Sequence, residues 1–130
     1  MEFENYKIIL IEKDNDGLFK SQLNEYVIDQ DGEFVSSFYK MNDKIYLSLT
    51  VDREVLDWEF SAIYDYYDLE VFNEFDLDIF EKDEDFNPTW TFVFDFCEDL
   101  NEKVDSILRI HKKELEEVCE AIKDKEEEYK

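Results

Sequence analysis

Glycine, proline, cysteine and histidine are all scarce in this chain of 130 residues. It has two glycines, one proline, two cysteines and one histidine. Because Gly17 and Gly32 stand far apart, the chain cannot form the glycine-rich loops that cradle phosphate groups. The same scarcity leaves no glycine-rich or proline-rich linker, so we expect a single domain over residues 1–130.

Long apolar runs are also missing from the sequence. No stretch approaches the roughly 20 uncharged apolar residues of a membrane-spanning helix. The first residues, Met-Glu-Phe-Glu, differ from the basic start of a signal peptide. We therefore expect a cytoplasmic protein with no membrane partner. In that compartment Cys97 and Cys119 are expected to be free thiols rather than a disulfide.

The single histidine restricts the catalytic chemistry that the chain could perform. His111 falls on an apolar stripe, where a buried or rim position is the simpler interpretation. Cys119 lies about 12 Å further along a helix axis, so it cannot pair with His111 within that helix. Carboxylate pairs can hydrolyse glycosides, but any pair among 37 acidic residues fits by chance. We favour a non-enzymatic protein, with a divalent-cation-dependent enzyme that uses carboxylates as an alternative.

One segment partly matches the calcium-binding loop of an EF-hand. Glu12, Asp14, Asp16 and Gly17 have the spacing of ligand positions one, three and five and of the glycine that follows. Position twelve, which should be a bidentate glutamate, is Leu23, and the preceding residues alternate as in a strand. A hairpin turn is therefore the favoured interpretation, and no metal site or cofactor is predicted.

Negative charge is what the chain has in excess. It carries 37 acidic and 14 basic residues, which gives a formal net charge of −23. A poorly hydrophobic chain of this charge would stay unfolded. Here 44% of the residues are hydrophobic and 17% are aromatic, and each buried aromatic side chain removes about 150–250 Å² from water. We expect a folded protein that is more stable at moderate salt.

The first half of the chain has the alternation that is typical of β-strands. From Ile45 to Val51, apolar and polar residues alternate, which places one face of the strand in a core. Asn42-Asp43 and Asp31-Gly32 suit the tight turns of hairpins. We expect an antiparallel meander whose strands are Tyr6–Glu12, Tyr26–Asp29, Glu33–Tyr39 and Ile45–Val51.

A helix is predicted after the fourth strand. Leu56, Phe60, Ile63 and Tyr67 recur at spacings of four and three, which makes one apolar stripe, and Asp52 would be the N-cap. Two further strands should follow. They are Phe75–Phe80 and Thr89–Phe96, and in the second strand Trp90, Phe92, Phe94 and Phe96 share one face, which we assign to the core.

A long helix is predicted from about Asp99 to near Tyr129. Its apolar stripe could form a coiled-coil seam in a homodimer, or it could cover the sheet of its own domain. We favour the second arrangement because the sheet needs a cover, and a monomer or a dimer through this helix remains open. The elements together predict an α+β fold, an antiparallel sheet of about six strands with one mid-chain helix and one long C-terminal helix packed on it. The stripe consists of Val104, Leu108, His111, Leu115, Val118 and Ile122.

The acidic residues are concentrated in the middle of the chain. The first 50 residues carry 10 acidic and 5 basic residues, the next 50 carry 17 and 2, and the last 30 carry 10 and 7. On a helix, like charges three or four residues apart each cost about 0.2–0.5 kcal/mol, which interspersed bases would relieve. The predicted partner-binding residues are the ridge Glu54, Asp57, Asp65 and Asp68 on the mid-chain helix, the row Glu74, Asp76 and Asp78, and the loop residues Glu81, Asp83, Glu84 and Asp85.

This charge should repel nucleic acid and anionic membranes and should attract basic partners at a salt-dependent rate. Along a helix, neighbouring carboxylates fall several Å apart, on the scale of the phosphates of a nucleic-acid strand. The sequence thus supports an interaction protein that binds the basic surface of a nucleic-acid-binding protein, as nucleic-acid mimics and inhibitors do. The alternative is a soluble protein whose surface acidity only limits aggregation.

Two segments resemble those of known proteins. They are residues 57–67, with the sequence DWEFSAIYDYY, and Asn87-Pro88-Thr89-Trp90. Both resemble segments of small uncharacterised acidic proteins from Gram-positive bacteria of the clostridial type. The resemblance implies a bacterial protein of unknown function and assigns no catalytic or binding residue.

Overall fold

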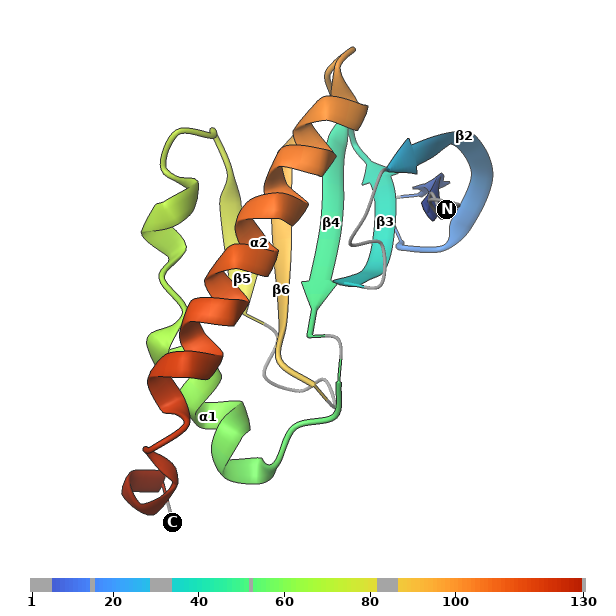
Figure 1. Cartoon of the computed structure of the whole chain (residues 1–130). Coiled ribbons are helices and arrows are strands. Elements are labelled where there is room, and N and C mark those ends of the chain that lie inside the picture. The colour runs from blue at the N-terminus through green and yellow to red at the C-terminus, as the bar shows by residue number, and fades with distance from the viewer. Residues whose placement is uncertain (1–5, 15, 29–33, 52, 82–86, 130) are drawn as a thin grey trace, which may run out of the picture.

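A six-stranded sheet with helices on one of its faces makes up the protein (Figure 1). The computed structural model describes residues 6–14, 16–28, 34–51, 53–81 and 87–129. The predicted α+β class, with a mid-chain helix and a long C-terminal helix, is confirmed. The strands are β1 (Tyr6–Lys13), β2 (Phe19–Ile28), β3 (Val35–Met41), β4 (Lys44–Thr50), β5 (Asp78–Glu81) and β6 (Thr89–Asp95). The helices are α1 (Asp57–Tyr66) and α2 (Leu100–Ile122), with the short 3-10 helices η2 (Leu69–Phe72) and η3 (Glu126–Tyr129).

The strands are ordered β2-β1-β3-β4-β6-β5 across the sheet. All neighbouring pairs are antiparallel except β1 and β3, which run parallel. The predicted meander is therefore wrong at one point, because β2 lies at the edge of the sheet instead of between β1 and β3. The sequences explain the order, since β1 (YKIILIEK) is the more apolar of the two and β2 (FKSQLNEYVI) carries the polar side chains that suit an edge strand.

Two turns were predicted correctly from their residue types. Asn42 and Asp43, between β3 and β4, have φ values of 54° and 66°, the left-handed conformation of a type I′ hairpin turn. In the turn between β1 and β2, the Asp14 carboxylate accepts hydrogen bonds from the backbone amides of Asp16 (2.9 Å) and Leu18 (3.0 Å). The EF-hand-like residues thus form a hairpin turn. The predicted Asp31-Gly32 turn lies outside the described residues.

The core lies between α2 and the sheet. All six residues of the predicted α2 stripe are buried, so the stripe covers the sheet of its own domain, as we favoured. Trp90, Phe92 and Phe94 of β6 are buried beneath it. Phe96 was predicted to share this core but is 46% exposed, because β6 ends at Asp95 and the side chain falls beyond the last paired residue.

Several predicted boundaries are wrong, the most important being the start of α1. Asp52 lies outside the described residues, and the helix begins at Asp57. Its first turn is capped from within, because the Glu59 carboxylate accepts a hydrogen bond from the Leu56 amide (2.9 Å) and pairs with Arg53. Other elements differ in length: β2 begins at Phe19, β5 begins at Asp78 after η2 and a turn, and α2 ends at Ile122, where a turn leads into η3.

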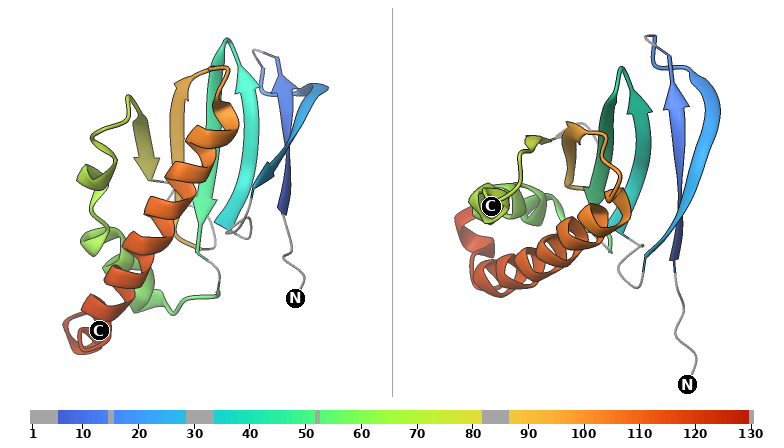
Figure 2. Two further views of the ribbon diagram at one scale, coloured as in Figure 1. Left: turned by 45° about the horizontal axis from the view of Figure 1, so that its top comes forward. Right: turned by 90° about the horizontal axis from the view of Figure 1, so that it is seen from above.

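Both α1 and α2 lie on the same side of the sheet (Figure 2). On the other side, cross-strand partners form a continuous row that consists of Gln22, Ile11, Tyr39, Tyr46, Val93 and Asp78. Tyr46 alternates with the buried Ile45 and Leu47, which fixes this row on the side opposite α2. Among the described residues no helix covers this side, yet Ser48, Thr91 and Val93 on it are buried.

The type I′ turn yields a test of the fold. Replacing Asp43 by glycine creates the Asn-Gly pair that this turn favours, so stability should rise by about 0.5–1 kcal/mol. The exposed contact of Asp43 with Lys40 (3.8 Å) contributes little. Urea unfolding of the wild type and Asp43→Gly measures the difference. A destabilised variant would mean that the backbone does not adopt this turn.

Candidate functional site

Eight of the predicted partner-binding residues are described, and each of them is exposed. They lie before and on α1, around η2 and along β5, which together form one side of the molecule (Figure 1). Asp83, Glu84 and Asp85 lie outside the described residues. We call the described set the acidic surface: Glu54, Asp57, Asp65, Asp68, Glu74, Asp76, Asp78 and Glu81.

The predicted ridge along a single helix is wrong. Only Asp57 and Asp65 lie on α1, because Glu54 precedes the helix and Asp68 follows it. Asp68 instead is the N-cap of η2, where its carboxylate accepts a hydrogen bond from the Glu70 amide (3.0 Å). The acidic side chains therefore do not form the evenly spaced row on one helix that would copy the phosphates of a nucleic-acid strand.

The stretch of sequence that carries the acidic surface has almost no basic residue of its own. From residue 51 to residue 81 the sequence contains 11 acidic residues and one basic residue, Arg53. The guanidinium group of Arg53 donates to both carboxylate oxygens of Glu59, at 3.2 and 3.0 Å. This pairing lowers the pKa of Glu59 and raises that of Arg53. The one cation of the segment is thus engaged by a carboxylate outside the acidic surface.

Part of the acidic surface borders a groove along α2. Two hollows of about 210 and 350 Å³ lie between α2 and the chain from η2 to β5, and Glu74 lines both of them. We call them together the acidic groove. On the η2–β5 side it is lined by Val71, Glu74, Phe75 and Asp76, and on the other side by Cys97, Asp99, Glu102, Lys103, Ser106, Ile110, Lys113, Glu114 and Glu117.

The groove combines negative charge with apolar side chains. Its lining contains six carboxylates and two lysines, and Lys103 lies over the Phe94 ring at 4.6 Å. Glu74 and Asp76 were predicted from the sequence, whereas the carboxylates of α2 were not. These carboxylates form a second helical stripe beside the apolar stripe of α2. Their spacing was the signal from which they could have been predicted. That the stripe faces η2 follows only from the tertiary structure.

Glu114 connects the groove to the core. Its side chain is only 6% exposed, and its carboxylate accepts a hydrogen bond from the Asp68 amide (2.9 Å). Burial raises the pKa of Glu114, and the nearby carboxylates of Glu117 and Asp68 add to the effect. Glu114 therefore fixes the end of α1 against α2 at one end of the groove.

His111, one turn earlier on α2, is fully buried. Its Nε2 lies 2.8 Å from the carbonyl oxygen of Thr50, and its Nδ1 lies 2.7 Å from the hydroxyl of Tyr67. Because a carbonyl can only accept, Nε2 carries the proton and Nδ1 accepts from Tyr67. Burial lowers the pKa of His111 to about 4 and raises that of Tyr67. Both ring nitrogens are thus used in structural hydrogen bonds, as the prediction of a buried histidine implied.

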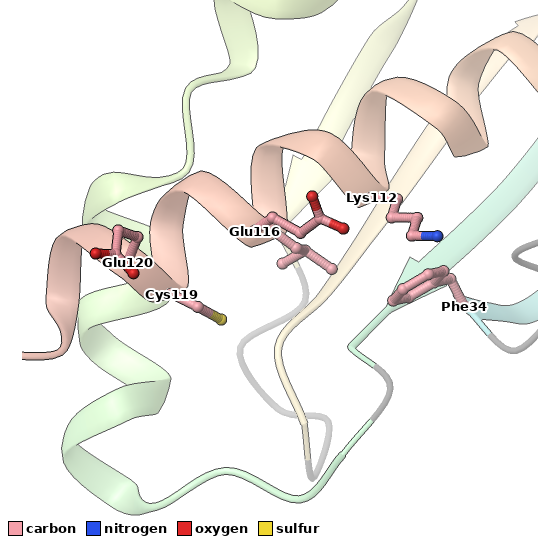
Figure 3. A pocket seen from close by; sticks show the side chains of 6 residues that line it. Phe34, Lys112, Glu116, Cys119 and Glu120 are labelled. Atoms are coloured by element: carbon pink, nitrogen blue, oxygen red, sulfur yellow. The ribbon is translucent and has the colours of Figure 1, made fainter.

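A third hollow, of about 350 Å³, lies beside α2 near the start of β3 (Figure 3). Phe34, Lys112 and Cys119 are among its lining residues. Cys97 and Cys119 are free, as predicted, and burial raises the pKa of the Cys97 thiol. The only histidine is engaged in the core, so no imidazole base is available to activate the Cys119 thiol in this hollow.

Two structural findings concern metals and membranes. In the part of the chain that is described, no three His, Cys, Asp or Glu side chains come together in a way that could hold a metal ion. Over the same residues, no helix combines the length and the apolar character needed to cross a bilayer.

The buried histidine yields a prediction of pH dependence. His111 titrates near pH 6.5 in the unfolded chain and near pH 4 in the folded one, so between these values the unfolded chain binds more protons. The contribution of neutral His111 to the stability of the fold is complete above pH 6.5 and is lost as the pH falls toward 4. From pH 7.5 to pH 5, the wild type should therefore lose about 2 kcal/mol more stability than His111→Gln. Urea unfolding of both proteins at both pH values measures this, and equal losses would contradict a buried neutral histidine.

Comparison with known proteins gives one match. No curated protein and no solved structure matches the chain. A family model covers residues 1–130, in agreement with the resemblance to uncharacterised proteins. The chain therefore belongs to the family of unknown function DUF6762.

Proposed function

We propose that this protein is a non-enzymatic interaction protein that binds a basic segment of a partner protein. The observation that carries the proposal is the acidic groove, where six carboxylates and several apolar side chains line two hollows along α2 that share Glu74. A Lys- or Arg-rich segment with occasional apolar residues would match both properties of such a lining.

The charge of the whole chain supports the same partner. A net charge of −23 draws a basic protein toward the surface and accelerates its association, an effect that salt screens. On the acidic surface the carboxylates are exposed, so they keep much of their hydration until a partner arrives. Close charge pairs formed on binding then add specificity and slow dissociation.

Nucleic-acid-binding proteins are the partner class that fits best, because their binding sites collect Lys and Arg to neutralise phosphates. The protein would then compete with nucleic acid for that site, as an inhibitor does. The support comes from charge and from the groove. It does not come from helical spacing, because the acidic residues are not evenly spaced along one helix. The alternative to be tested is that the surface acidity serves only solubility.

Charge reversal tests the proposal. Tagged wild-type protein and two variants capture partners from lysate of the source cells at low and high salt. Glu74→Lys/Asp76→Lys reverses two groove residues. Asp16→Lys/Asp43→Lys makes the same change of net charge at two exposed turn positions outside the groove. The groove variant should lose about tenfold or more of the captured basic protein, and the control should lose much less.

Two further conditions sharpen this experiment. Added duplex DNA should displace the captured protein if its nucleic-acid site is the one occupied, and high salt should release it in every case. Capture of no basic protein, or equal losses in both variants, would mean that the acidity serves solubility.

A further inference from the structure

The last turn of the described chain folds back from α2 onto α1. After α2 ends at Ile122, the Lys125 amide donates a hydrogen bond to the Ile122 carbonyl (2.8 Å) as the chain turns into η3. In both views of the molecule η3 lies beside α1 (Figure 1 and Figure 2), and the two elements are in contact. We call residues 123–129 the C-terminal strap.

The strap is attached to α1 through Tyr129. The Tyr129 hydroxyl donates a hydrogen bond to the Asp65 carboxylate (2.7 Å), and its ring lies 6.5 Å from the ring of Trp58, centre to centre. The bond to Asp65 raises the pKa of Tyr129 to about 12, so the hydroxyl remains a donor at physiological pH. Asp65 is a member of the acidic surface, and here its carboxylate is already engaged by a residue of its own chain.

Charge opposes the contact between the strap and α1. The sequence of η3 is EEEY, and α1 contains three acidic residues and no basic one. The two lysines of the strap form ion pairs with residues three positions away along the chain, Lys123 with Glu120 and Lys125 with Glu128. These pairs join the strap to α2 and to itself, not to α1. Like charges on η3 and α1 therefore weaken the closed strap, most strongly at low salt.

The Trp58 indole gives a second indication that the closed strap is only marginally stable. Trp58 packs against the core, and its Nε1 is buried without a hydrogen-bond partner among the described residues. A buried N–H group that lacks a partner is destabilising, and water satisfies such a group once it is uncovered. The closed arrangement thus leaves one donor unpaired beside a contact between like charges.

We propose that the C-terminal strap opens and closes over Trp58 and, when closed, withholds the Trp58 ring and the Asp65 carboxylate from a basic partner. Tyr129 alone reaches both groups, and a Lys or Arg side chain is long enough to do the same. A carboxylate pairs with such a cation, and an indole attracts it more strongly than other aromatic rings do. The strap and the partner therefore compete for this part of the acidic surface.

This competition rests on the proposed function, because the partner is the same basic segment. Opening of the strap is a property of the chain alone and can be measured without a partner. The two proposals can therefore fail separately.

Hydrogen exchange of the two indole N–H groups tests the strap. Trp58 and Trp90 give separate indole signals in isotope-labelled protein, and Trp90, which is fully buried in the core, is the internal reference. Tyr129→Phe keeps the ring and the net charge but removes the hydrogen bond to Asp65. The Trp58 indole should then exchange about threefold faster or more, while the Trp90 rate stays the same.

Two further variants of the full chain complete this measurement. Tyr39→Phe makes the same change at a tyrosine on the other side of the sheet, where it stacks on Tyr46, and should leave Trp58 exchange unaffected. Tyr129→Ala also removes the ring next to Trp58 and should raise the rate further. An unchanged Trp58 rate in Tyr129→Phe, or an equal rise for Trp58 and Trp90, would overturn the strap.

Binding of a Lys-rich peptide separates the strap from the proposed function. Because the closed strap must be displaced first, Tyr129→Phe should bind the peptide more tightly than the wild type, by the factor that its Trp58 exchange increases, about threefold or more. Tyr39→Phe should bind it as the wild type does. Equal affinity of Tyr129→Phe and the wild type would overturn the competition. Faster Trp58 exchange in Tyr129→Phe without peptide binding by any chain would support the strap and contradict the proposed function.

Discussion

Burial of the α2 stripe against the sheet is the interaction on which the rest of the structure depends. The stripe supplies most of one side of the core, and its one polar member, His111, is satisfied by Tyr67 after α1 and by the Thr50 carbonyl at the end of β4. Because an unpaired buried imidazole would cost several kcal/mol, about 2–7 by analogy with other polar groups, these bonds fix the rotation of α2. Rotation of α2 in turn decides which side chains line the acidic groove.

The same arrangement explains how a strongly acidic chain folds. Among the side chains whose burial is described, carboxylates are excluded from the core apart from Glu114, which accepts a hydrogen bond from the Asp68 amide. The sheet order places the acidic β5 edge and the near-neutral β1–β2 hairpin at opposite ends. The negative charge is therefore concentrated toward one end of the sheet, where Phe80 of β5 is also exposed.

Sequence periodicity was sufficient to predict the elements whose apolar pattern repeats over many residues. The alternation in β4 and β6, the α2 stripe and the Asn42-Asp43 turn were all predicted, because local geometry determines them. The start of α1 was not predicted, because the pairing of Arg53 with Glu59 caps the helix after the expected position. The parallel β1–β3 pair and the groove depend on contacts between distant segments, which no local pattern contains.

The central claim is that carboxylates placed by α2 form a defined site for a basic segment. Amide chemical shifts of isotope-labelled protein, titrated with a Lys-rich peptide containing a few leucines, test it most directly. We expect shift changes confined to residues 71–76 and to one face of α2 from Asp99 to Glu117, and we expect 0.5 M salt to abolish them, because about 4 Å of screening length remains at that ionic strength. Changes spread evenly over all acidic residues would contradict a defined site.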